Sequence, residues 1–154
     1  MKTGKAFQAG VIGAVVMSLL MFLARSVMGM PANLEMMLGT MFTEPGNTAW
    51  IIGFVMHLLI SGCIALLYGF AFENIAHRAG WLAGAGFGAV HAVIAGVFMG
   101  MISSVHPRMP DPVMPPGAFM SNMGMMGIVA IIMLHIIFGA VVGQLYGPVL
   151  KPSR

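Results

Sequence analysis

The chain has 154 residues, of which 59% are hydrophobic and only 7% are charged. An ordinary soluble domain carries about 25% charged residues, and the mean hydropathy here is +0.96, so the composition excludes a soluble globular protein. The few charges form no basic patch that could follow a phosphate backbone, which excludes a nucleic-acid partner.

Four long apolar segments follow one another along the chain. In the first two, 19 uncharged residues separate Lys5 from Arg25 and 28 separate Glu44 from Glu73. A helix needs about 20 apolar residues to cross about 30 Å of hydrocarbon. The sequence therefore predicts transmembrane helices near residues 6–28, 50–72, 80–103 and 123–146. We expect an all-α membrane protein, a single four-helix bundle over residues 1–154 with the lipid bilayer as its surroundings.

The charges predict how this bundle is oriented. On the side of the two termini and the second connection lie Lys2, Lys5, Arg78, Lys151 and Arg154. On the other side, acidic residues offset Arg25 and Arg108 in the connections 29–49 and 104–122. By the positive-inside rule both termini are cytoplasmic, and we expect the bacterial inner membrane. The proline-dense segment 106–117 cannot form a helix and is expected to cap the outer surface.

An internal repeat is indicated by two matching spacings. His57 is followed eleven residues later by Tyr68 and then by a glycine, and His135 is followed in the same way by Tyr146. This pattern favours two repeated helical hairpins, related by an axis along the membrane normal. The alternative is chance similarity between apolar helices of similar composition.

Three histidines lie at nearly the same predicted depth. If Tyr68 and Tyr146 mark the aromatic interface, His57 and His135 lie about 16 Å inward at 1.5 Å per residue. His91 lies ten residues after Trp81 and reaches a similar level. An ionisable side chain at the bilayer centre costs at least about 2.5 kcal/mol, which marks it as a functional candidate.

Small residues indicate which way these histidines face. Glycine or alanine recurs every four residues from Gly80 to Gly100, and His57 and His135 belong to similar stripes. Such stripes allow helix backbones to approach, so they face protein rather than lipid. The simpler interpretation is that each histidine only hydrogen-bonds a neighbouring helix.

Methionine is abundant and unevenly placed. Of 18 methionines, 13 fall in the outer segments 28–41 and 99–126, whereas Met17 lies near the histidine level. Thioether sulfur is a soft ligand that selects Cu(I). The gradient suggests a route for a soft metal from the outer face to the centre, although methionine also serves as a flexible apolar filler.

Three functions remain open from the sequence. The first is binding of a soft transition metal, copper above all, by His57, His91, His135 and Met17, with outer capture at His106, Met109 and Met114. The second is a haem-b electron-transfer subunit with His57 and His135 as axial ligands. The third is a non-catalytic accessory subunit of a larger membrane complex.

No enzyme motif is present, neither a metalloprotease H-E-x-x-H nor a phosphate-binding P-loop. We therefore expect a protein without catalytic residues of its own, although the sequence leaves open that it is a subunit of an oxidoreductase complex. Whether it forms a homo-oligomer or joins other membrane proteins is also left open.

Overall fold

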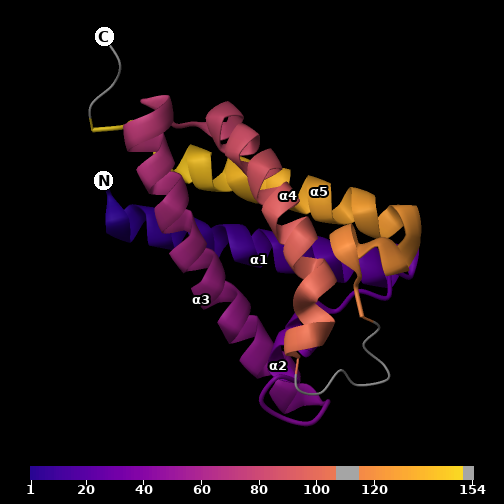
Figure 1. The fold of residues 1–154 in the computed structure, drawn as a ribbon. Helices are drawn as coiled ribbons and strands as arrows, with labels where there is room; N and C mark the ends of the chain where they lie inside the picture. The colour runs from indigo at the N-terminus through magenta and orange to yellow at the C-terminus, as the bar shows by residue number, and fades with distance from the viewer. Residues whose placement is uncertain (107–114, 151–154) are drawn as a thin grey trace.

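The structure is a computed structural model that describes residues 1–106 and 115–150, and over these ranges it contains helices but no strand. Figure 1 shows its four long helices. They are α1 (Thr3–Met28), α3 (Asn47–Ala71), α4 (Trp81–Val105) and α5 (Gly124–Tyr146). All four are long and apolar enough to cross a membrane. The four long helices are confirmed where the spans were predicted, with ends that differ by three residues at most.

Shorter helical turns connect the long helices. A π-helical turn, η1 (Phe72–Ala76), continues α3, and a 3-10 turn, η2 (Ala118–Met123), precedes α5. The first outer connection, expected as a plain loop, contains the short helix α2 (Leu34–Gly39). It begins where it does because the Asn33 side chain accepts a hydrogen bond from the Met36 amide at 3.0 Å, a typical helix N-cap. Of the proline-dense segment, residues 107–114 lie outside the described ranges.

Glycines draw the long helices together at one end of the bundle. A Cβ on Gly84 would overlap the carbonyl oxygen of Gly139, and one on Gly10 would overlap that of Ser61. The Gly80 amide also donates a 3.0 Å hydrogen bond to the Gly143 carbonyl. Helix α4 therefore packs closely on α5, and α1 on α3, through small residues, as is typical of helices in lipid.

The same end of the bundle holds the start of α1 and the end of α5. The Tyr146 hydroxyl donates a 2.6 Å hydrogen bond to Glu73 and accepts one from the Lys2 amide at 3.1 Å. Away from this end the packed pair α1 and α5 separates from α3 and α4, and Figure 1 shows the far ends of α3 and α4 approaching each other at α2. The bundle is therefore narrow at the end of the termini and wide at the other end.

The two tyrosines do not form an interfacial belt. Tyr68 and Tyr146 are buried in the core, where Tyr68 packs edge-on against Phe72 and Phe138. Their predicted depth stays a prediction, but the two rings face the core rather than lipid, and each hydroxyl has a hydrogen-bond partner on another segment. A buried tyrosine needs such a partner, and the narrow end of the bundle supplies it.

Replacement of Gly84 by Ala should destabilise the protein, because the added methyl group has no room against the α5 backbone. Overpacking costs typically about 1–3 kcal/mol. Thermal unfolding in detergent micelles measures the effect. Gly86→Ala, two residues along the same helix where a Cβ meets nothing within 4 Å, is the matched control. Equal melting temperatures for the two variants would contradict this packing.

Candidate functional site

The wide part of the bundle encloses a cavity of about 330 Å³. All four long helices line it, and α2 and η2 contribute at the end away from the chain termini. The four residues singled out for a metal, His57, His91, His135 and Met17, all lie in its wall. Sequence reasoning thus identified residues that the fold brings to one space, although their role stays a prediction.

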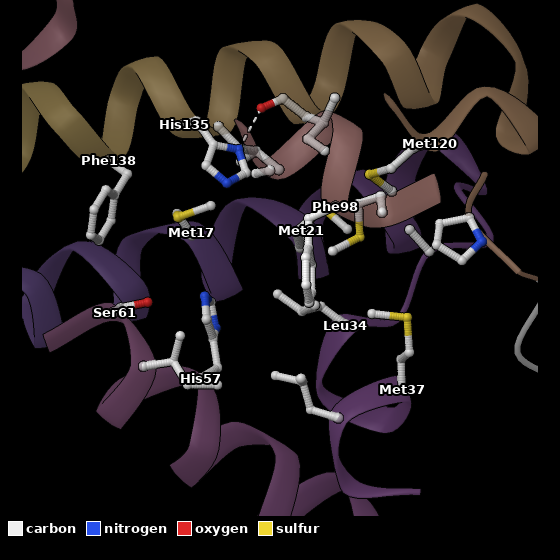
Figure 2. A pocket seen from close by; sticks show the side chains of 18 of the residues that line it. Met17, Met21, Leu34, Met37, His57, Ser61, Phe98, Met120, His135 and Phe138 are labelled. Carbon is white, nitrogen blue, oxygen red and sulfur yellow. Dashed lines mark hydrogen bonds between the residues drawn. The ribbon is translucent and has the colours of Figure 1, made fainter. Parts of the chain in front are cut away.

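His57 is buried in the α3 wall, and the α1 hydroxyl of Ser18 lies 3.1 Å from its Nδ1. Figure 2 shows the His57 ring directed across the cavity toward the side of Met17 and His135. The hydroxyl orients the imidazole and leaves Nε2 for another interaction. Partners of this kind fix the ring orientation of histidine ligands in metal sites.

His135 and His91 form a pair on the opposite side. Their ring centroids are 4.6 Å apart, with the planes nearly perpendicular. His135 Nδ1 donates a 2.7 Å hydrogen bond to the Ile131 carbonyl, so in the neutral ring Nε2 carries the lone pair. Figure 2 shows this second nitrogen directed toward Met17 and His57. The Tyr68 hydroxyl lies 3.1 Å from His91 Nδ1.

Six methionines line the same cavity. Met17 lies between His57 and His135 in Figure 2, and the remaining five lie farther toward the outer end. The full set is Met17, Met21, Met37, Met99, Met120 and Met123. The outer methionines of the sequence therefore include four that face inward, from α2, α4 and η2.

Glu35 was missed by sequence reasoning, which assigned it only to the balance of charges at the outer surface. It is 3% exposed and lines the cavity from α2. Its position follows from Gly53, because a Cβ there would overlap the Glu35 carbonyl oxygen, and His57 follows Gly53 by one helical turn. The Asn33 cap with an acidic residue in the first turn is a helix-start signal that could have revealed α2.

The structure describes only one of the three residues that were predicted for outer capture of the metal. Met109 and Met114 lie outside the described residues. His106 is buried at the end of α4, and its Nε2 donates to the Met37 carbonyl at 2.9 Å and lies 3.2 Å from the Thr40 hydroxyl. These contacts link the end of α4 to α2, so His106 helps to hold α2 in place at one end of the cavity.

The imidazoles and carboxylates are not gathered into a complete ligand set. Within residues 1–106 and 115–150, no three His, Cys, Asp or Glu side chains lie close enough together to hold a metal ion. A metal bound here would therefore need sulfur as a further donor. No protein-family model, curated protein or solved structure matches this chain, so the function has to be argued from the cavity itself.

Replacement of His106 by Phe should loosen α2. The loss of a buried hydrogen bond costs about 1–3 kcal/mol, and local opening becomes easier by that amount. Hydrogen exchange of the α2 amides should therefore accelerate about tenfold. His77→Phe, at an exposed histidine near the narrow end, is the control. Unchanged exchange in the His106 variant would show that α2 is held by its glycine contacts with α3 alone.

Proposed function

We propose that the protein binds a soft transition-metal ion, copper as Cu(I), inside its transmembrane bundle. The observation that carries the proposal is the arrangement in Figure 2, where Met17 lies between the imidazoles of His57 and His135. Two imidazoles and one thioether are a donor set that suits Cu(I) and not hard cations such as Mg²⁺. His91, beside His135, is available as a further ligand.

The hydrogen bonds around the imidazoles support this proposal. Ser18 and the Ile131 carbonyl each hold the Nδ1 side of one ring, which leaves the Nε2 atoms to bind. Loss of such an outer partner typically lowers metal affinity about 10- to 100-fold. The same arrangement orients the rings before the metal arrives.

Charge also supports a cation in this cavity. A cation held by neutral imidazole and thioether ligands would bring an uncompensated charge into a low-dielectric space, which is costly. Glu35 supplies a carboxylate in the wall, one turn beyond His57. Among the described lining residues there is no Lys or Arg to compete for that carboxylate.

The inward-facing outer methionines provide a route. Met37, Met120 and Met123 lie toward α2 and η2, and Met21 lies between them and Met17 along the cavity. Thioethers bind Cu(I) without forming disulfides in an oxidising compartment. We infer that they pass the ion inward, with Met109 and Met114 as weak capture sites ahead of them.

Titration of purified, reduced protein with Cu(I) against a chromogenic chelator tests the proposal. We expect one Cu(I) per chain, and no stoichiometric binding by His57→Ala or His135→Ala. Met17→Leu and Ser18→Ala should weaken binding, the latter about 10- to 100-fold. Binding should also weaken at low pH, because protons compete for the imidazole lone pairs.

Met133→Leu is the matched control, since Met133 lies on α5 two residues before His135 but is exposed and outside the cavity wall. It should bind like the wild type. Replacement of Met109 or Met114 should slow loading and leave the final affinity unchanged. A Soret band in the purified protein would instead indicate bis-His haem b, and no Cu(I) uptake at neutral pH would indicate an accessory subunit.

We further propose that both termini are cytoplasmic, in a bacterial inner membrane, and that the helices form two repeated hairpins. The charge distribution supports the orientation. The buried hydroxyls of Tyr68 and Tyr146, each bonded to a side chain on another helix, support the repeat. The packing between hairpins is nevertheless unequal, since α1 packs on α5 whereas α3 and α4 lie apart along most of their length.

Reporter fusions test the orientation. Alkaline phosphatase, which is active only outside the cytoplasm, should be inactive when fused after residue 150 and active when fused within residues 41–46. A cytoplasmic fluorescent reporter should show the reverse pattern. Phosphatase activity at the C-terminal fusion would contradict the proposed topology.

A further inference from the structure

The cavity opens sideways between α3 and α4. Ile60 of α3 and Ile94 and Phe98 of α4 line it and are also 43%, 64% and 51% exposed. Figure 1 shows these two helices apart along most of their length and approaching each other at α2, with α1 and α5 behind them. We call this opening the α3–α4 window. Both helices are apolar spans, so the window faces lipid hydrocarbon and admits molecules dissolved in the bilayer.

The cavity is larger than a metal ion requires. Its volume of about 330 Å³ falls in the range of about 300–1,000 Å³ typical of sites for small organic molecules. Apart from the three histidines, Glu35, Asn33 and Ser61, its lining residues are apolar. Its walls therefore suit a mostly apolar ligand that makes a few directed hydrogen bonds.

The charge of the wall restricts the head of such a ligand. Among the described residues that line the cavity there is a carboxylate, Glu35, but no Lys or Arg. A phosphate or carboxylate head would lose its hydration without gaining a cation, which is costly. The wall therefore excludes an anionic head.

The hydrogen-bonding groups lie on opposite walls. His57 extends from α3, whereas His91 and His135 lie together on α4 and α5. His135 Nε2 is an acceptor because Nδ1 donates to Ile131. When the Ser18 hydroxyl donates to His57 Nδ1, the His57 Nε2–H becomes a donor. A flat ring with an oxygen at each end would meet one imidazole at each side.

We propose that the cavity binds the ring of a membrane-dissolved quinone beside Met17, with one oxygen at His57 and the other at the His91–His135 pair. The carbonyls of a para-benzoquinone would accept from His57 Nε2–H and, when the Tyr68 hydroxyl donates to His91 Nδ1, from His91 Nε2–H. A hydroxyl of the reduced form would instead donate to His135 Nε2. The apolar tail leaves through the α3–α4 window past Ile94 and Phe98 and remains in the bilayer. This ligand is distinct from the metal of the proposed function, and its binding is tested on metal-free protein.

The test uses the full chain in phosphatidylcholine nanodiscs with a chelator present. The probe is a radiolabelled benzoquinone with a ten-carbon tail, and the competitor is decylbenzene, which has a ring and tail but no oxygen. We expect saturable binding of one quinone per chain that decylbenzene does not displace. Displacement by decylbenzene, or an absence of saturable binding, would overturn the proposal.

Variants separate the window from the rest of the surface. Ile94→Trp should narrow the window and weaken quinone binding. If the Trp variant does not fold, Ile94→Phe is used in its place. Val93→Trp adds the same bulk one residue earlier, at a position that is 55% exposed and outside the cavity wall, and should bind like the wild type. Equal affinities for the folded Ile94 and Val93 variants would overturn entry through the window.

Discussion

The close approach of glycine backbones at one end of the bundle is the constraint on which the rest of the structure depends. In lipid, helices gain little from burying apolar surface, so they associate through close packing and hydrogen bonds. Gly84 and Gly139 bring α4 against α5, and Gly10 brings α1 against α3. Beyond these contacts the packed pair α1 and α5 separates from α3 and α4, and the space between them becomes the cavity. The cavity is therefore a consequence of where the small residues lie.

The histidine side chains that line the cavity are oriented by hydrogen bonds. Each imidazole has a partner at Nδ1, either a hydroxyl or a backbone carbonyl, which offsets part of the cost of placing it in hydrocarbon. The second nitrogen of His135 is then directed into the cavity. A set of oriented nitrogens in an apolar space is suited to binding, whether the ligand is a soft metal or a neutral ring.

Helix α2 covers one end of the cavity and is held there by its own contacts. Helix α2 is fixed to α3 through Gly39 and Gly53 and to α4 through His106. It carries Glu35 and Met37 to the cavity wall, so the outer connection contributes directly to the candidate site. A movement of α2 would change the charge and the sulfur content of the wall together.

The sequence by itself determined the four long apolar helices, the presence of one histidine within each of three of them, and their small-residue faces, because hydropathy and helical periodicity are local properties. His57, His135 and Met17 could be predicted to meet for the same reason. Only the tertiary structure decided that the Tyr68 hydroxyl lies against His91 and that Glu35 lies within one helical turn of His57 in the cavity wall. It also decided that α3 and α4 stay apart beside the cavity. These features depend on contacts between residues far apart in the chain, and on side chains whose direction is set by packing rather than by their place in a helical period.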